Sequence, residues 1–492
     1  MHTQQKDGSM SQITATVAAP AHSKYLHVAA EHKVLPLLII VALFLGLWNL
    51  EQPAGLTLDT WHMLIIFVIT LISIIANILP MGALALIGLS LCMITKTLTC
   101  REALNGFSSN IAWLILSAFL LARGFIKSGL GKRVGYYFIY LFGKSVLGIS
   151  YALVFAECIL APFIPSNTAR GAGIIFPIIK SLLAQEQLNT NRMGAYLVNL
   201  CFQANVITSG MFLTAMAANP LLASVAKTVY GIELTWLFWA KAAIVPGLLT
   251  LLLLPVCFYV VYRPGVKHTP EAPALAKEQL QAMGAITTHE WIMIGTFALL
   301  MFLWTVGYQW DIDPVAAALL GLTILFLTRV LTWDDVLKEQ QAWNTFIWLA
   351  TLLMMSESLT RMGLMSWFGE HVEYMVDDMN WIVALSVIGV LYYYTHYLFA
   401  SMTAHVSSLF AAFALIATAA GAPPLLTILL LCGYSSLCGS LTHYGTGTAP
   451  IYYDTGYLNI QGWWKMGFVF SLFHMTVWGF SGAVWWKVLG LW

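Results

Sequence analysis

The sequence contains very little charge. Only 9% of its 492 residues are charged, and they divide into 23 Lys+Arg and 22 Asp+Glu. Soluble globular domains carry about a quarter charged residues, so this chain has too few charges to solvate a globular surface. The formal net charge of +1 and the lack of a basic run give no argument for a nucleic-acid partner. An ordinary soluble protein is therefore excluded.

Motifs for metal binding and catalysis are also missing. The seven cysteines lie mostly inside apolar stretches, and none forms a CxxC pair or has zinc-like spacing. Such cysteines usually pack as small hydrophobic residues, so we expect no metal site and no cofactor. Glu157, Asp454 and His443 leave an intramembrane enzyme as a minor alternative. No HExxH, paired catalytic Asp or Ser/His/Asp arrangement accompanies them, so we expect no enzymatic activity.

Apolar residues dominate what is present. Hydrophobic residues make up 59% of the chain, and the mean hydropathy is +0.79. Apolar stretches long enough to cross a hydrocarbon core of ~30 Å recur along the chain, and the 19 Trp and 20 Tyr suit membrane interfaces. We predict an all-α polytopic membrane protein with a polar cytoplasmic segment at 1–33 and a first transmembrane helix at 34–54. The polar start resembles neither a signal peptide nor a transit peptide, which favours a bacterial inner (plasma) membrane.

An internal repeat divides the chain into two halves. Three blocks recur in the same order, and the offset between matching positions increases by one from each block to the next. The halves cover 55–263 and 290–492, and a polar linker at 264–289 joins them. The matching blocks are Leu98-Thr99 and Leu104 with Leu331-Thr332 and Leu337; Asn110, Lys127 and Gly129-Leu130 with Asn344, Arg361 and Gly363-Leu364; and Ser166-Asn167-Thr168-Ala169-Arg170 with Ser401-Met402-Thr403-Ala404-His405.

The distribution of charged loops predicts that the halves are inverted. Basic residues flank the segment before the first motif and occur in the linker, whereas the loop before the second motif is acidic. Because basic loops face the cytoplasm, the two motifs would enter the membrane from opposite sides, as in inverted-repeat transporters. The residues are Lys132, Arg133, Lys144, Arg263, Lys267 and Lys277 on the basic side, and Glu370, Glu373, Asp377 and Asp378 on the acidic side.

Each motif is predicted to form the tip of a re-entrant hairpin. Pro162 and Pro165 end one helix, and the small polar residues Ser166, Asn167 and Thr168 precede a new apolar stretch. Such residues cap helix N-termini, where backbone N–H groups and the helix dipole favour anions. We expect hairpins near 145–184 and 380–420. An ordinary loop between two full spans is the alternative for the first motif.

Arg170 and His405 lie four residues after Ser166 and Ser401 respectively. On a helix this spacing places each of them one turn along the same face. Two cationic positions beside two helix N-termini would suit a dianion. Arg170 could instead form a structural ion pair or extend to the interface, and His405 could be a hydrogen-bonded core residue.

A second polar cluster follows each motif, and Thr208 follows Ser166 at almost the same spacing as Thr442 follows Ser401. Small, hydroxyl, Gly and Pro residues in mid-membrane indicate unwound helices that line a site, although small residues also serve tight helix packing. The candidate site residues in these clusters are Thr208, Ser209, Asn219, Thr442 and His443.

The segment Pro165-Ser166-Asn167-Thr168-Ala169-Arg170-Gly171 resembles the signature of the divalent anion/sodium symporter family. Leu441-Thr442-His443-Tyr444 and Ser401-Met402-Thr403 resemble its 2-oxoglutarate/malate translocator and citrate/succinate exchanger branch. The resemblance extends from about residue 35 to the end of the chain. It implies eleven transmembrane helices, two re-entrant hairpins, a homodimer and elevator-type movement. It also implies that substrate carboxylates bind Ser166, Asn167 and Thr168 at one tip and Ser401 and Thr403 at the other.

Two features depart from the sodium-coupled members of that family. Met402 replaces an Asn, and Arg170 and His405 bring positive charge close to where sodium would bind. A fixed cation in place of a bound one favours obligate exchange of C4/C5 dicarboxylates, of the 2-oxoglutarate, malate and succinate class, with citrate or tartrate as further candidates. The alternative is a sodium- or proton-coupled symporter on the same fold, and only that alternative would involve sodium.

Overall fold

The computed structural model describes residues 22–76, 78–185, 188, 190–376 and 380–492, and the elements within these ranges are helical. Within these ranges, eight helices are long and apolar enough to cross a membrane, and four shorter apolar helices accompany them. This confirms the prediction of an all-α membrane protein. Residues 1–21 of the predicted N-terminal segment lie outside the described residues, and residues 22–33 belong to α1 (His22–Trp48), which ends before the predicted residue 54.

The first half follows α1 and contains the first hairpin. Its helices are α2 (Leu58–Ile75), α3 (Met81–Ile94), α4 (Cys100–Leu104), α5 (Asn110–Ser128), α6 (Leu130–Phe142), α7 (Val146–Leu160), α8 (Asn167–Arg170), α9 (Phe176–Leu183), α10 (Asn191–Met211), α11 (Asn219–Tyr230) and α12 (Trp236–Val261). A π-helical turn, Gly171–Ile175, joins α8 to α9.

The second half begins after the linker helix α13 (Glu271–Ala282). Its helices are α14 (Thr288–Val306), α15 (Pro314–Leu327), α16 (Trp333–Lys338), α17 (Gln340–Arg361), α18 (Leu364–Val376), α19 (Trp381–Thr395), α20 (Met402–Ala419), α21 (Pro424–Leu437), α22 (Ala449–Tyr453) and α23 (Ile460–Val488). Both halves therefore present the same order of elements.

Unusual backbone conformations recur at matching positions of the repeat. Gly129 and its counterpart Gly363 have φ of 82° and 84°. Lys96 and its counterpart Arg329 have φ of 60° and 58°, although non-glycine residues rarely adopt such values. Conformations this specific at matching positions support the repeat found in the sequence.

The two halves exchange the same contacts with each other. Helix α5 packs on α15 of the other half, and α17 packs reciprocally on α3. Lys127 Nζ lies 2.6 Å from Asp335 Oδ2, and in the matching contact Arg361 Nη2 lies 3.5 Å from Glu102 Oε1. The hydrogen bond from Lys127 lowers the pKa of the Asp335 carboxyl, and one from Thr99 lowers that of Glu102. Reciprocal contacts of this kind are typical of a two-fold relation.

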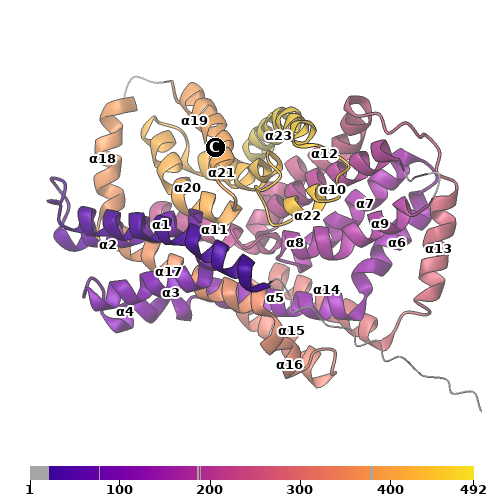
Figure 1. The fold of residues 1–492 in the computed structure, drawn as a ribbon, viewed down its shortest axis with the longest axis horizontal. Coiled ribbons are helices and arrows are strands. Elements are labelled where there is room, and N and C mark those ends of the chain that lie inside the picture. The colour runs from indigo at the N-terminus through magenta and orange to yellow at the C-terminus, as the bar shows by residue number, and fades with distance from the viewer. Residues whose placement is uncertain (1–21, 77, 186–187, 189, 377–379) are drawn as a thin grey trace, which may run out of the picture.

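The helices form two packed groups (Figure 1). The lower group in that view contains α2, α3, α5, α14, α15 and α17, and the upper group contains α7–α12 and α19–α23. Helices α6 and α18 connect the lower group to the upper one, and each is preceded by a left-handed glycine, Gly129 or Gly363.

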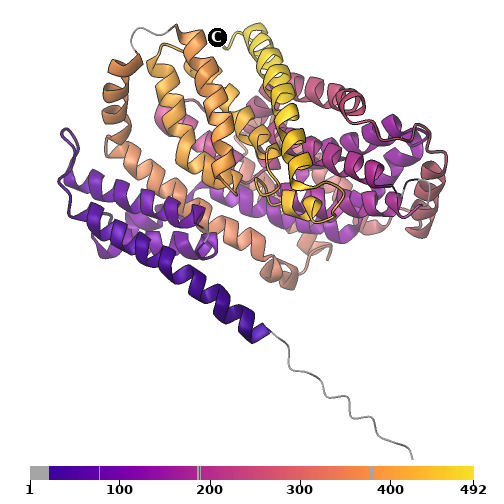
Figure 2. The ribbon, with the colours of Figure 1, turned by 45° about the horizontal axis from the view of Figure 1, so that its top comes forward.

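The basic loop and the linker lie together. Arg133 Nη1 donates to Gly284 O of the linker over 3.0 Å, and Val146 N donates to Lys267 O. Helices α13 and α18 lie at opposite ends of the molecule in both views (Figures 1 and 2). This separation agrees with the predicted division into basic and acidic sides, although Asp377 and Asp378 lie outside the described residues. The orientation of each half in a bilayer remains a prediction.

Candidate functional site

The first hairpin consists of α7 and the helical arm that begins at Asn167. A 3-10 turn, Ala161–Phe163, follows α7, and Ser166 caps the new helix by accepting a hydrogen bond from Ala169 N over 3.1 Å. Asn167 Oδ1 accepts from Thr168 N over 2.9 Å. The prolines end one helix because they lack an N–H, and the polar triplet starts the next.

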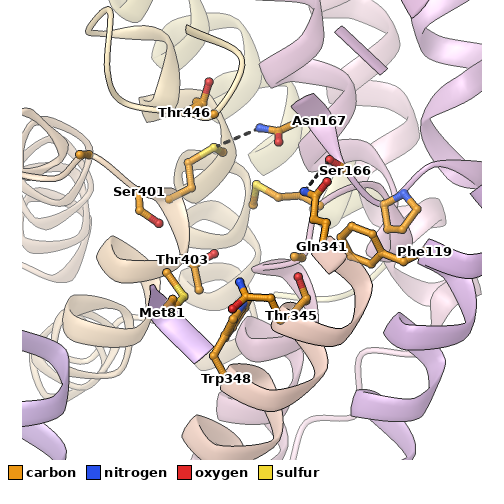
Figure 3. A pocket seen from close by; sticks show the side chains of 17 residues that line it. Met81, Phe119, Ser166, Asn167, Gln341, Thr345, Trp348, Ser401, Thr403 and Thr446 are labelled. Carbon is orange, nitrogen blue, oxygen red and sulfur yellow. Dashed lines mark hydrogen bonds between the residues drawn. The ribbon is translucent and has the colours of Figure 1, made fainter. Parts of the chain in front are cut away.

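The second hairpin repeats this geometry with other residues. A 3-10 turn, His396–Leu398, follows α19, and Ser401 caps α20 by accepting a hydrogen bond from Ala404 N over 3.4 Å. The tips of the two hairpins touch, because Asn167 Nδ2 lies 3.7 Å from Met402 Sδ (Figure 3).

A cavity of about 300 Å³ lies where the two tips meet the lower group of helices. Five predicted site residues line it: Ser166, Asn167, Ser401, Met402 and Thr403. Thr446 and Gly447, which follow His443, and Met216 and Ala217, which lie between Ser209 and Asn219, also line it. The remaining lining residues are Met81, Phe119, Pro165, Gln341, Asn344, Thr345, Trp348 and Ala400.

The start of α17 supplies polar residues that the sequence analysis missed. Gln341 Nε2 donates to Ser166 Oγ over 3.0 Å, which links the lower group of helices to the first tip (Figure 3). Asn344 Oδ1 accepts from Gly82 N over 3.1 Å, and Thr345 lies beside it. The sequence contained one signal for this part of the site, namely several polar residues at the start of an apolar helix: Gln340, Gln341, Asn344 and Thr345.

The described residues that line the cavity include no formally charged side chain. They offer amide and hydroxyl groups, and helix N-termini begin at Asn167 and Met402. Helix N-termini carry partial positive charge and free N–H donors. The cavity is therefore suited to an anion that accepts hydrogen bonds at both of its ends.

Arg170 does not line this cavity, and its predicted contact with substrate stays a prediction. It is fully buried beneath the first tip, and its Nε donates to Glu157 Oε1 over 2.9 Å. Its other nitrogens donate to Ile164 O, Ala215 O and Ser209 Oγ over 2.5–2.8 Å. Because protein groups occupy the guanidinium, we assign Arg170 to bracing the tip, the structural ion pair that the sequence left open.

His405 also lies behind its tip and outside the cavity lining. Its Nε2 lies 3.1 Å from Tyr392 O and 3.0 Å from Thr395 Oγ1. Tyr392 is the repeat partner of Glu157, by the same offset that relates His405 to Arg170, so the two halves brace their tips from the same positions. The predicted contact of His405 with substrate likewise stays a prediction.

The other predicted residues support the broken helices. Ser209 Oγ donates to Asn205 O over 2.7 Å, and Thr208 Oγ1 does so over 3.1 Å. Asn219 Nδ2 donates to Ser209 O and Phe212 O, which are carbonyls at the end of α10. Thr168 and Thr442 lie near Gly447 and Gly445, and His443 Nδ1 accepts from Trp464 Nε1 over 3.1 Å. None of these predicted residues lines the cavity.

Two halves that exchange contacts, with broken helices meeting at a polar cavity, define a secondary membrane transporter. A family model described as "Sodium:sulfate symporter transmembrane region" matches residues 31–492. The chain belongs to this family. The match confirms the family resemblance and a multi-pass membrane protein.

Three relatives are similar over almost the whole chain. A putative malate transporter of Bacillus subtilis is 48% identical over 94% of this chain and 97% of its own length. Dicarboxylate transporter 1 of Spinacia oleracea, a chloroplastic protein, is 45% identical over 93% of this chain and 82% of its own. A citrate/succinate antiporter of Escherichia coli is 31% identical over 93% of this chain and 97% of its own length. These relatives are named as transporters, in agreement with the expectation that the chain is not an enzyme.

Two solved structures share the fold. The YdaH transporter of Alcanivorax borkumensis aligns with a TM-score of 0.56 at 12% identity, over 80% of this chain and 89% of its own. MtrF of Neisseria gonorrhoeae aligns with a TM-score of 0.53 at 12% identity, over 91% of this chain and 97% of its own. At this identity they support the transporter fold alone.

Proposed function

We propose that this protein transports C4/C5 dicarboxylates of the 2-oxoglutarate, malate and succinate class by obligate exchange. The observation that carries the proposal is the cavity of about 300 Å³ into which both hairpin tips point. A dicarboxylate has an anionic group at each end, and each group would meet one helix N-terminus with its serine cap. The names of the relatives support the same substrate class.

Exchange is favoured because the chain supplies the groups that hold its own tips. Arg170 is bonded to Glu157 and to two backbone carbonyls, and His405 is bonded to Tyr392 O. A tip that side chains hold in place needs no bound cation to keep its shape. No Asp or Glu is found among the described lining residues to coordinate one. With fixed groups in place of a bound cation, the carrier would not return empty. It would change sides only with substrate bound, and transport would therefore be obligate exchange.

An elevator movement fits the division into two helix groups. The cavity lies between them, with Gln341 and Trp348 on one side and the two tips on the other. The connecting helices α6 and α18 both begin after a left-handed glycine, and such positions absorb backbone rotation in hinges. We further propose a bacterial inner (plasma) membrane, because two of the relatives are bacterial transporters. The proposed homodimer rests on the family resemblance alone.

The test of function is uptake of labelled 2-oxoglutarate into proteoliposomes. Vesicles would contain unlabelled malate or no substrate, each with and without an inward sodium or proton gradient. We expect uptake only into loaded vesicles and no dependence on either gradient. Gradient-dependent uptake into empty vesicles would instead establish the symporter, and no uptake of any dicarboxylate would reject the substrate class.

The same assay tests the cavity as the binding site. Gln341→Ala removes a lining amide and the hydrogen bond to Ser166 Oγ, so we expect an apparent KM about tenfold higher, since a hydrogen bond contributes roughly 0.5–1.5 kcal/mol. Gln340→Ala is the matched control, because Gln340 is exposed and lies outside the cavity lining. Equal KM values for the two variants would place the substrate elsewhere.

A further inference from the structure

Three side chains that commonly bind metals meet behind the second hairpin tip. They are His396 in the 3-10 turn, His405 in the first turn of α20, and Cys438 directly after α21. One ligating atom from each lies within 4.8 Å of those of the other two, and all three side chains are fully buried. None of them lines the dicarboxylate cavity, so this cluster is separate from the proposed substrate site.

Hydrogen bonds orient both imidazoles with Nδ1 available. Nε2 of His396 lies 3.0 Å from Gly445 O, and Nε2 of His405 lies 3.1 Å from Tyr392 O. A backbone carbonyl only accepts, so Nε2 carries the proton in each ring. In a neutral ring, Nδ1 then holds a lone pair. Metal-binding histidines show this same outer arrangement, with the other ring nitrogen donating to a carbonyl.

The Nδ1 atoms are not satisfied by strong partners. Nδ1 of His396 is buried and has no hydrogen-bond partner among the described residues. Nδ1 of His405 lies 3.9 Å from Cys438 Sγ, and a thiol is only a weak donor. A buried nitrogen lone pair without a donor costs free energy. A bound metal ion would be coordinated by the two Nδ1 atoms and by Cys438 Sγ. The spacing of the three residues along the sequence did not predict that they lie together.

We propose that His396, His405 and Cys438 form a binding site for one Cu⁺ ion. Imidazole and thiolate ligands suit Cu⁺ and Zn²⁺. Zn²⁺ normally takes four ligands, whereas this cluster offers three. Binding of Cu⁺ would release the Cys438 thiol proton to solvent and leave a neutral complex of Cu⁺, thiolate and two imidazoles. Zn²⁺ would leave an uncompensated positive charge in the membrane interior, which is costly.

The test is Cu⁺ binding to the purified full-length protein in detergent, without substrate. Cu⁺ would be supplied anaerobically with a reductant, in competition with the chromophoric chelator bicinchoninate. We expect one tight Cu⁺ per chain, and X-ray absorption showing nitrogen and sulfur ligands. Cys438→Ser should weaken this binding at least ~100-fold, more than the loss of an outer-shell partner costs.

Two further variants make the result decisive. Cys432→Ser is the matched control, because Cys432 is also buried and lies in α21 but outside the cluster, and it should bind like the wild type. His396→Gln gives a second measurement if Cys438→Ser fails to fold, and it should lose the tight ion as well. Unchanged affinity in either cluster variant would overturn the site. Tighter binding of Zn²⁺ than of Cu⁺ would overturn the choice of metal. Neither result depends on which substrate is transported.

Discussion

Protein groups surround the side chain of Arg170 and accept its hydrogen bonds. It is fully buried, and the structure gives it four protein acceptors in the first half: Glu157 in α7, Ile164 before the tip, Ser209 in α10, and Ala215 in the 3-10 turn after α10. A buried charge is tolerated when it is paired and hydrogen-bonded. Glu157 supplies the compensating charge, and its Oε1 also accepts from Asn205 Nδ2 over 2.6 Å. The first tip is therefore held by the protein itself.

Removing the countercharge should destabilise the protein. Glu157→Gln leaves Arg170 buried without a carboxylate, and breaking a buried pair from one side costs about 3–5 kcal/mol. We expect a clearly lower apparent Tm in detergent. Glu233→Gln is the control, because Glu233 pairs with Lys227 while both side chains are well exposed, and exposed pairs contribute little. The same fall in Tm for both variants would contradict the bracing role.

The sequence predicted the residues at the hairpin tips and missed those that reach the cavity from elsewhere. Ser166 and Asn167 were identified from a proline-flanked polar triplet, which reports its own local backbone. Ser401, Met402 and Thr403 were identified because they repeat that motif at the matching position of the second half. Gln341 is far from Ser166 along the chain, and no local pattern reports that they meet. The spacing placed Arg170 and His405 on the same helix face as the motif serines, but it could not predict their hydrogen-bond partners, because those come from other helices.

At the scale of elements, the backbone at Gly129 and Gly363 marks the starts of the two connecting helices. Both residues have a left-handed φ, and a Cβ at Gly363 would meet nothing within 4 Å. Sterically open space means that any cost of a side chain there comes from the backbone alone. The same left-handed conformation occurs in both halves. This indicates that the turn into each connecting helix requires it, whatever the sequence of the surrounding loop.

Gly363→Ala should therefore lower stability through backbone strain. A left-handed conformation costs a residue with a Cβ roughly 1–2 kcal/mol, which we expect to see as a lower apparent Tm. Gly363→Asn should cost less, because Asn tolerates this region. Gly295→Ala in α14, where a Cβ also meets nothing, should be neutral or slightly stabilising. If Gly363→Ala were as stable as Gly363→Asn, the strain argument would be wrong.

The sequence predicted where the helices break at the two motifs, but the helix boundaries were less predictable. Pro162, Pro165 and the repeated polar motif marked both tips. The first helix was placed at 34–54, whereas α1 ends at Trp48 and begins at His22, within a segment that reads as polar. The π turn after α8 has no local signature beyond two glycines. It depends on packing, since a Cβ on Gly171 would lie 2.7 Å from Thr448 Cγ2.

At the scale of the whole molecule, the two helix groups form the framework for the proposed movement. They meet through the pairs α11 with α17, α2 with α20 and α12 with α14. A second cavity, of about 340 Å³ and largely apolar, lies along the same boundary between α2, α17 and α18 on one side and α11 and α20 on the other. A loosely filled apolar boundary is compatible with one group sliding past the other.

A spin-label distance measurement would detect that sliding. One label would occupy Cys100, which is exposed on α4, and the other Val488→Cys, at the exposed end of α23 in the upper group. Cys158 and Cys257, which are partly exposed, would be changed to Ala. We expect two distance populations whose ratio changes with 2-oxoglutarate. The control pair is Cys100 with Leu327→Cys. Both positions lie outside the upper group, so this pair should give one distance that does not change with 2-oxoglutarate. A single distance for both pairs would reject the elevator movement.

The lack of formal charge among the described lining residues determines how the proposed carrier responds to voltage. Arg170 and Glu157 cancel each other, so this pair adds no net charge to that of the substrate at the site. One charge moved through 100 mV corresponds to about 2.3 kcal/mol. Exchange of two dianions would move no net charge, and its direction would be the same in energised and de-energised cells. Exchange of a trianion for a dianion would be electrogenic, and the membrane potential would then set its direction.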